Sequence, residues 1–153
     1  MILLRRFTLA LFLTLAGFAM SQALSSDVPK AQKPAASLDG KWALTSAELA
    51  GNPFPKALLD SFTLILDKGH YTLKSPSPDD KGTTKIDDTK TPKELDIKGE
   101  EGPNKGKTML AIYELDGDTL KVCYDLEGKK RPTEFKTASG TKQFLAQYKR
   151  VKE

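Results

Sequence analysis

The side chains with the most obvious capacity for chemistry are one cysteine, one histidine and scattered carboxylates. Cys123 could serve as a nucleophile in its thiolate form, which a nearby Lys121 would favour. A Cys–His pair would have to recruit His70, the only histidine in the sequence. His70 by itself cannot make an ordinary zinc site, which needs several cysteine or histidine ligands. We therefore predict no metal site and no nucleophile–base pair from these residues.

The carboxylates occur in patterns that turns and exposed faces explain better than catalysis. Asp116-Gly117-Asp118 lacks the ligand spacing, ending in Glu, that a calcium loop requires. Glu114, Asp125 and Glu134 could supply paired carboxylates for glycoside hydrolysis, but we expect all three at the surface. Glu134 could instead form an ion pair with Arg131 at a barrel rim. Since no nucleophile, base and orienting group occur together, the sequence predicts a protein that is not an enzyme and needs no cofactor.

The elements that carry these residues show an alternation of apolar and polar side chains. Every second residue is apolar in 62–66 and 120–124, as expected for strands with one buried face. Asp67-Lys68-Gly69 and Asp116-Gly117 supply hairpin turns between such runs. Links of hairpin length between neighbouring strands predict an antiparallel meander.

The remaining segments bring the total to about eight short strands. Residues 85–87 and 94–98 are polar strand candidates, and residues 133–136 and 142–151 supply the last two. A short helix is expected over residues 55–60, where Pro55 precedes good helix formers. Because an open sheet of this width would expose long edges, we predict an all-β, small antiparallel up-and-down barrel with one short helix between its first two strands.

Residues 1–23 have the pattern of a Sec-type signal peptide. Arg5 and Arg6 precede an apolar run, and Ser21-Gln22-Ala23 is a small-x-small cleavage pattern. A transmembrane anchor is the alternative, but the apolar run of about 14 residues is shorter than the roughly 20 that cross a bilayer. We therefore expect an exported, periplasmic or secreted protein with no transmembrane span in the mature chain.

The rest of the chain divides into a linker and one domain. Residues 24–37 are rich in Ala, Lys, Pro and Ser and predict a disordered linker, and residues 38–153 form the barrel domain. Without residues 1–23 the chain has 22 basic and 20 acidic residues, which leaves a net charge near +2. These charges are interleaved, and Lys129-Lys130-Arg131 is best interpreted as a solvated turn. We expect no nucleic-acid partner.

Gly40-Lys41-Trp42 resembles the Gly-x-Trp signature on the first strand of lipocalins. In that family the tryptophan plugs the closed end of the barrel, and an arginine near the C-terminus packs over its ring. The resemblance assigns these closure roles to Trp42 and Arg150, a cation–π contact of roughly 0.5–2 kcal/mol. The chain departs from true lipocalins in being shorter and in lacking a Thr-Asp-Tyr signature.

The folded part as a whole also resembles an uncharacterised lipocalin-like domain family that is expanded in planctomycete bacteria. The residues that carry this second resemblance are Gly102-Pro103, Gly106-Lys107, Ile112-Tyr113-Glu114-Leu115, Cys123 and Arg131-Pro132-Thr133-Glu134-Phe135. Members are commonly secreted and have no assigned activity. The resemblance therefore implies a fold and export, and it implies nothing about chemistry.

A lipocalin-like barrel can enclose a lumen, and the sequence offers apolar side chains to line it. The candidate ligand-binding residues are Phe62, Leu64, Leu66, Met109, Ala111, Tyr113, Leu120, Val122, Tyr124 and Phe135, with Phe144 and Tyr148 as further candidates. The alternative is that they fill a packed core. If Leu120 and Val122 point inward, Cys123 faces outward; with the faces reversed it lines the lumen.

Two functions remain open at this point. The first is a binding module for a small apolar or amphipathic molecule. The second is a packed, non-enzymatic scaffold of the cell envelope that uses its outer face or its long polar segments, residues 75–93 and 99–107, to contact a partner. An outer-membrane barrel is disfavoured because lysines such as Lys41 and Lys121 would face lipid.

Overall fold

The structure is a computed structural model that describes residues 37–152. The expected signal peptide and, except for Ser37, the expected linker lie outside the described residues. Within residues 37–152 the elements in chain order are β1 (Gly40–Leu49), β2 (Asn52–Pro53), α1 (Lys56–Leu59), β3 (Thr63–Asp67), β4 (His70–Lys74), β5 (Asp80–Asp87), β6 (Lys93–Glu101), β7 (Thr108–Asp116), β8 (Thr119–Asp125) and β9 (Gln143–Arg150).

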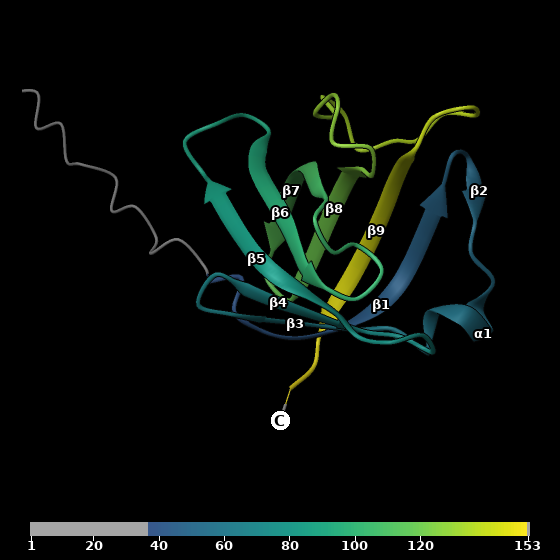
Figure 1. Cartoon of the computed structure of the whole chain (residues 1–153), viewed down its shortest axis with the longest axis vertical. Coiled ribbons are helices and arrows are strands. Elements are labelled where there is room, and N and C mark those ends of the chain that lie inside the picture. The colour runs from purple at the N-terminus through teal and green to yellow at the C-terminus, as the bar shows by residue number, and fades with distance from the viewer. Residues whose placement is uncertain (1–36, 153) are drawn as a thin grey trace, which may run out of the picture. The chain divides into compact units, whose positions relative to one another are not determined.

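The strands form one antiparallel sheet that closes on itself (Figure 1). Each long strand pairs with its neighbours in chain order, and β9 pairs back with β1 from Leu49↔Phe144 to Trp42↔Arg150. The two-residue β2 pairs only with β1 and adds nothing to the wall. The prediction of an all-β, antiparallel up-and-down barrel is confirmed, with α1 between the first two long strands, β1 and β3.

Strand β1 closes the barrel because it pairs along both of its edges. Its first residues pair with β3, where Trp42 lies opposite Leu64, and the strand pairs with β9 from Trp42 to Leu49. The register against β9 shifts between Leu44 and Ser46. A bulge of this kind bends a strand and increases its twist, which allows β1 to leave β3 while it stays paired with β9.

Two of the three hairpin links at one end of the barrel are tight turns, as the sequence predicts, and the third is the five-residue β5–β6 link. Lys68 and Gly69 link β3 to β4 with φ values of 46° and 80°, the positive pair that a type I′ hairpin turn requires. The backbone N–H of Lys68 also donates to the Asp39 side chain at 3.0 Å. Gly117 links β7 to β8 with φ of 55°. These turns lie at the end where β1 begins.

Strands β5 and β6 are longer than their polar sequences suggest. Residues 85–87 and 94–98 were the expected extents, whereas the strands span Asp80–Asp87 and Lys93–Glu101. Their inward positions include a cross-strand pair of glycines, Gly82↔Gly99. A side chain at Gly82 would place its Cβ 1.9 Å from the Lys98 carbonyl oxygen. Glycine at inward positions hides the alternation by which strands are recognised.

The expected strand at residues 133–136 is wrong, because residues 126–142 form an irregular connection between β8 and β9. Part of it, residues 131–137, lies across the outside of the barrel, and we call it the strap. Arg131 donates to the carbonyl of Ala111 on β7 at 2.6 Å. At its other end, Thr137 hydrogen-bonds Glu48 on β1. With every wall strand already paired on both edges, the strap has no edge to join.

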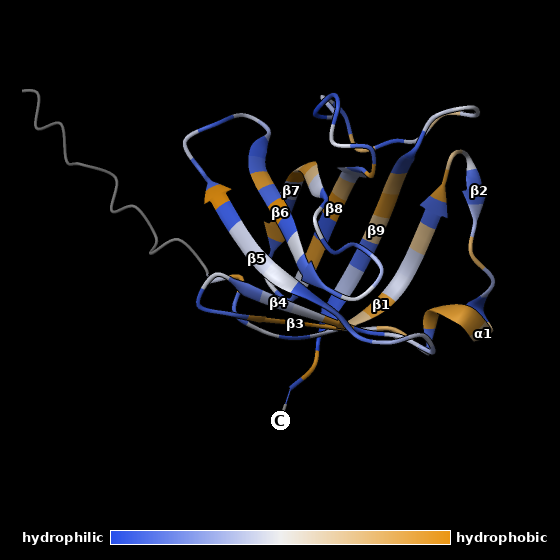
Figure 2. Cartoon of the chain, viewed as in Figure 1, coloured by the Kyte–Doolittle hydropathy of each residue, from blue (hydrophilic) through white to orange (hydrophobic). Residues whose placement is uncertain are grey.

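The hydrophobic core lies inside the barrel. Coloured by hydropathy, the strands show alternating apolar and polar residues (Figure 2). The buried cluster draws on every wall strand except β5, and on Leu59 of α1. The largest side chain within it is Trp42, which is fully buried. Alternation therefore places one face of each strand in a common interior.

Candidate ligand cavity

One end of the barrel is closed by Trp42 and Arg150. The Trp42 ring is fully buried, and its Nε1 donates to the Leu38 carbonyl at 2.9 Å. The Arg150 guanidinium carbon lies 4.1 Å from the ring centroid. Its Nη1 and Nη2 donate to the carbonyls of Asp39 at 2.5 Å and Ser37 at 2.9 Å. Arg150 thus ties the chain before β1 across the plugged end.

Gly40 is required for that arrangement. Its φ is 136°, and an added Cβ would lie 2.7 Å from Arg150 Nη1. The Gly-x-Trp spacing therefore has a physical reason here, because a bare glycine backbone lets the guanidinium reach the indole face.

The opposite end of the barrel contains a cavity of about 230 Å³. Leu64, Leu120 and Val122 form part of its wall and are buried. Phe54, Phe62, Tyr124, Leu126 and Phe144 also border the cavity, and they are only half-buried. Exposure thus increases away from Trp42, and these half-buried residues form what we call the mouth.

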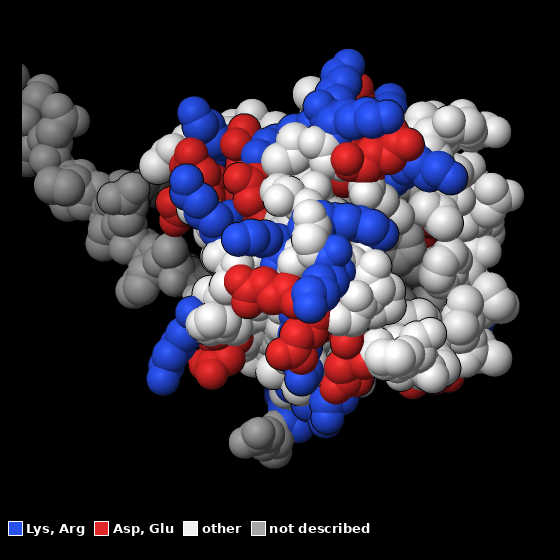
Figure 3. Space-filling view, viewed as in Figure 1, with Lys and Arg blue, Asp and Glu red and all other residues white. Residues whose placement is uncertain are grey.

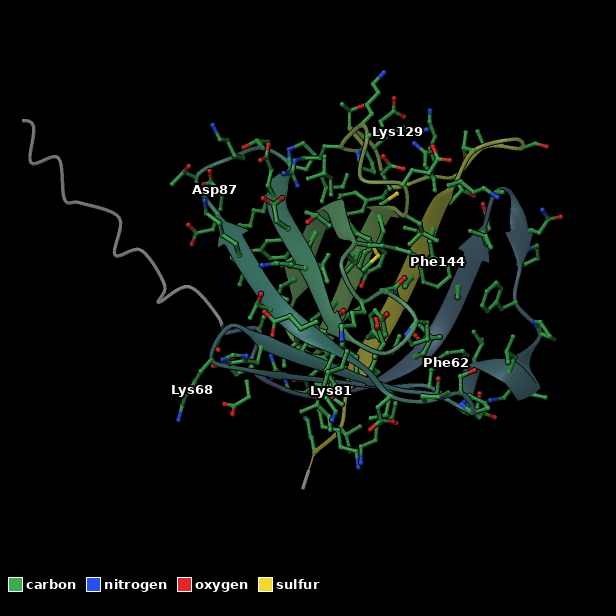
Figure 4. The ribbon with its side chains drawn as sticks, viewed as in Figure 1. Phe62, Lys68, Lys81, Asp87, Lys129 and Phe144 are labelled. Atoms are coloured by element: carbon green, nitrogen blue, oxygen red, sulfur yellow. The ribbon has the colours of Figure 1, made fainter. Side chains whose placement is uncertain are left out.

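The two ends can be followed in the figures. Phe62 and Phe144 lie on the side of the barrel near α1, whereas Lys68, in the turn at the closed end, lies on the opposite side (Figure 4). Charged side chains gather over β5, β6 and the β8–β9 connection, while the surface over α1 and β2 is largely uncharged (Figure 3). The aromatic mouth therefore opens next to an uncharged part of this face.

Most of the residues expected to line a lumen do so. Those that border the cavity are Phe62, Leu64, Leu66, Met109, Leu120, Val122 and Tyr124, together with Phe144 and Tyr148. Two others, Ala111 and Tyr113, are buried on the inner face of β7 but do not border the cavity. They follow Met109 toward the closed end, where the interior is packed.

The prediction that Phe135 lines the lumen is wrong, because this residue lies on the strap. It is half-buried on the outside of the barrel, with the Lys121 ammonium 5.6 Å from its ring centroid. Its apolar character and its place in an alternating stretch suggested an inward strand position. The residue instead covers the outer face of β8.

Several residues of the cavity wall were missed. Tyr71 and Leu73 alternate on β4, opposite Gly82 and Asp80, and their period of two could have identified them. The further apolar wall residues are Leu44, Leu49, Phe54, Leu95, Ile97 and Leu126. No local signal identifies Asp80 or Asn104, because their position on the wall depends on how the β6–β7 connection folds.

These last two residues belong to a polar group on a largely apolar wall. Asp80 is only 5% exposed. One carboxylate oxygen accepts the backbone N–H of Asn104 at 3.1 Å. The other accepts the Asn104 amide at 2.8 Å and the Tyr71 hydroxyl at 3.1 Å. Burial, reinforced by the Asp80 charge, holds the pKa of Tyr71 well above its usual value, so this hydroxyl remains a donor.

A second polar feature consists of two tyrosines at the bottom and rim of the cavity. Burial raises the pKa of Tyr148 to about 12. Burial and, secondarily, the neighbouring Tyr148 raise the pKa of Tyr124 well above its usual value. Both phenols therefore stay neutral at physiological pH and can donate or accept hydrogen bonds.

Cys123 is not poised for reactivity. It faces away from the cavity but is fully buried under the strap, where its Sγ lies 3.5 Å from the Lys136 carbonyl. Burial raises the pKa of its thiol. Lys121 does not favour the thiolate as expected, since its ammonium lies 3.7 Å from Glu114. The cysteine packs as a small apolar side chain.

The remaining candidates for chemistry are separated from the cavity. Among residues 37–152, no three His, Cys, Asp or Glu side chains gather into a metal-binding group, and His70 is exposed. Glu134 pairs with Lys136 at 2.5 Å, not with Arg131 as expected. Arg131 binds Glu94 at 3.2 Å and Asp96 at 2.5 Å, because the strap carries it over β6.

The expectation that Asp125 lies at the surface is also wrong, since this residue is buried. It is 8% exposed, and its oxygens accept the backbone N–H groups of Glu127, Lys129 and Lys130 at 2.7–3.3 Å. The carboxylate thus fixes the turn that follows β8. This turn includes the basic run, as the sequence suggested.

Comparisons with known proteins leave the family open. No family model matches the sequence, and no curated protein matches it. One solved structure is similar, a DUF4847 family protein from Bacteroides vulgatus ATCC 8482, whose crystal structure was determined at 1.00 Å. The likeness has a TM-score of 0.46 at 13% identity and covers 75% of this chain and 94% of that one. At these values it bears on neither family nor function.

The resemblance to a planctomycete family therefore stays a prediction. As for membranes, residues 37–152 contain no helix of the length and apolarity needed to span a bilayer.

Proposed function

We propose that this chain is an exported, non-enzymatic binding module that holds a small apolar or amphipathic molecule in the cavity of its barrel. The observation that carries the proposal is the cavity of about 230 Å³, which has an apolar wall and a half-buried aromatic mouth. Its presence favours a binding module over the alternative of a packed envelope scaffold. Export rests on the signal-peptide pattern of residues 1–23.

The volume of the cavity limits the size of the ligand. An apolar cavity of about 150 Å³ in another protein holds benzene, whereas sites for drug-sized molecules begin at about 300 Å³. At about 230 Å³, this cavity suits one or two fused rings or a short alkyl chain, and the half-buried mouth lets a further ring of a larger probe project outward. Each methylene buried contributes about 0.8 kcal/mol, or roughly a fourfold gain in affinity.

A fluorescent probe of suitable chemistry can test the proposal. Addition of N-phenyl-1-naphthylamine, which is neutral and apolar, to the purified protein should give saturable fluorescence enhancement with one site per chain. Leu64→Phe adds volume on the cavity wall and should abolish or strongly weaken binding.

Ile65→Phe is the matched control for that variant. Ile65 is the next residue on β3 and faces away from the cavity, so the same added ring should leave binding unchanged. The proposal is wrong if the wild-type protein shows no saturable binding. It is equally wrong if a folded Leu64→Phe variant binds the probe as the wild type does.

A further inference from the structure

The wall of the cavity carries one charged side chain, Asp80, among the residues that the structure describes. It lies at the start of β5 beside the mouth, on the inward face, opposite Leu73. No lysine or arginine borders the cavity within residues 37–152, and none there forms an ion pair with Asp80. A carboxylate thus faces an apolar space without a cationic partner.

Neutral donors hold that carboxylate in place. The three hydrogen bonds from Tyr71 and Asn104 use three of about four lone-pair positions on its two oxygens. The residue that supplies two of them, Asn104, is fixed by the tight fold of residues 99–106, where the Gly106 N–H donates to the Gly99 carbonyl at 2.9 Å. One acceptor position therefore remains available at a rigid carboxylate.

Such a site discriminates between the polar ends of amphipathic ligands. An ammonium or a hydroxyl can donate to Asp80, and a charge-assisted hydrogen bond of this kind is stronger in an apolar environment than in water. A carboxylate ligand would place a second negative charge beside the first, which like-charge repulsion and desolvation both oppose.

We propose that the cavity selects small amphipathic ligands whose polar end is a hydrogen-bond donor, a primary ammonium above all, and rejects fatty carboxylates. This inference rests on the proposed function, because it assigns the polar specificity of the same cavity. Asp80 is the specificity-determining residue, and Tyr71 and Asn104 position it.

A series of probes with equal chain length isolates the polar end. Octylammonium, 1-octanol and nonanoate share an eight-carbon alkyl tail, so displacement of N-phenyl-1-naphthylamine from the full chain at neutral pH compares their head groups. We expect octylammonium to bind most tightly, 1-octanol next, and nonanoate at least about tenfold more weakly than octylammonium, a difference of roughly 1.4 kcal/mol.

Asp80→Asn removes the charge while it keeps an acceptor at the same place. It should weaken octylammonium about tenfold and improve nonanoate, so the readout is the ratio of these two affinities within each variant. Asp79→Asn is the matched control, because this neighbouring aspartate is exposed and does not border the cavity. That variant removes the same charge and should keep the wild-type preference.

The outcomes separate the two proposals. If N-phenyl-1-naphthylamine does not bind the wild-type chain, the binding function itself fails. If it binds but nonanoate displaces it as well as octylammonium does, only the assignment of Asp80 fails. The ranking of the three ligands on the wild-type protein decides this even if Asp80→Asn does not fold. An equal loss of preference in Asp79→Asn would reduce the effect to net charge and overturn the assignment.

Discussion

The two ends of the barrel use aromatic side chains in opposite ways. At the closed end, Trp42 is fully buried, hydrogen-bonded to Leu38 and covered by Arg150. At the mouth, Phe62 and Phe144 remain half-buried beside about 230 Å³ of space. We infer from this difference that stability is concentrated at the closed end, which under the proposed function leaves the other end to bind the ligand.

The connections follow this division in part. The β3–β4 and β7–β8 links at the closed end are tight turns at Gly69 and Gly117, while the β5–β6 link at that end has five residues, 88–92. The longer connections, including residues 102–107 and 126–142, lie at the mouth. A rigid scaffold that carries variable loops at one end is the usual arrangement of binding proteins.

The largest expected effect comes from removing the plug. Trp42→Ala should destabilise the domain by about 3–5 kcal/mol, a large part of a typical stability of roughly 5–15 kcal/mol. Urea unfolding followed by circular dichroism measures the loss. Trp42→Phe keeps most of the buried volume and should cost less. A loss below about 1 kcal/mol for Trp42→Ala would contradict the division of roles between the two ends.

Removing the guanidinium over the plug should have the next largest effect. Arg150→Ala deletes the cation–π contact and the two hydrogen bonds to backbone carbonyls, at an expected cost of about 1–3 kcal/mol. The same unfolding experiment measures it. Lys149→Ala, on the exposed face of β9, is the control and should change stability by less than about 0.5 kcal/mol. Equal effects of the two substitutions would show that Arg150 contributes only charge.

At the mouth the expected effects on stability and on binding diverge. Phe144→Ala should cost about 1 kcal/mol or less in stability, because its ring is half-buried beside open space. It should weaken binding of N-phenyl-1-naphthylamine by about tenfold, since the probe loses an aromatic contact at the rim. A stability loss as large as that of Trp42→Ala, with unchanged probe binding, would reverse the comparison.

Alkaline pH gives the most gradual effect, because it is spread over about two pH units. Burial raises the pKa of Tyr148 to about 12, from an unfolded value near 10. Between these two values the unfolded chain releases the phenolic proton while the folded domain retains it, so stability falls as pH rises and is unaffected below pH 10. The urea midpoint measured from neutral pH to pH 12 tests this. Tyr148→Phe should flatten the decline, and an unchanged slope would assign it to other groups.

The sequence predicted most of the wall of the cavity because the alternation that identifies a strand is a local pattern. Leu64, Leu66, Leu120 and Val122 were identified from a period of two and do border the cavity. Phe135 shared that local pattern but lies on the strap outside. Alternation predicts which residues share a face of a segment. It does not predict whether that segment pairs with the edge of another strand.

The polar part of the site had no signal in the sequence. Asp80 and Asn104 are separated by 24 residues and meet only because the β6–β7 connection folds back over β5. The burial of Cys123 likewise depends on the strap, which crosses the outer face of β8. Long-range contacts of irregular segments have no periodicity from which they could be inferred.

The amino-acid sequence by itself determined the closed antiparallel barrel, its tight turns and the Gly-x-Trp start of β1. Alternation and turn residues are local signals, and closure follows from the number of strands, because an open sheet of that width would expose its edges. Only the tertiary structure decided that the interior keeps a cavity at one end and that a lone carboxylate, Asp80, faces it. The volume of a cavity and the hydrogen-bond partners of a buried charge depend on which distant segments come into contact. The paths of the connecting loops determine those contacts.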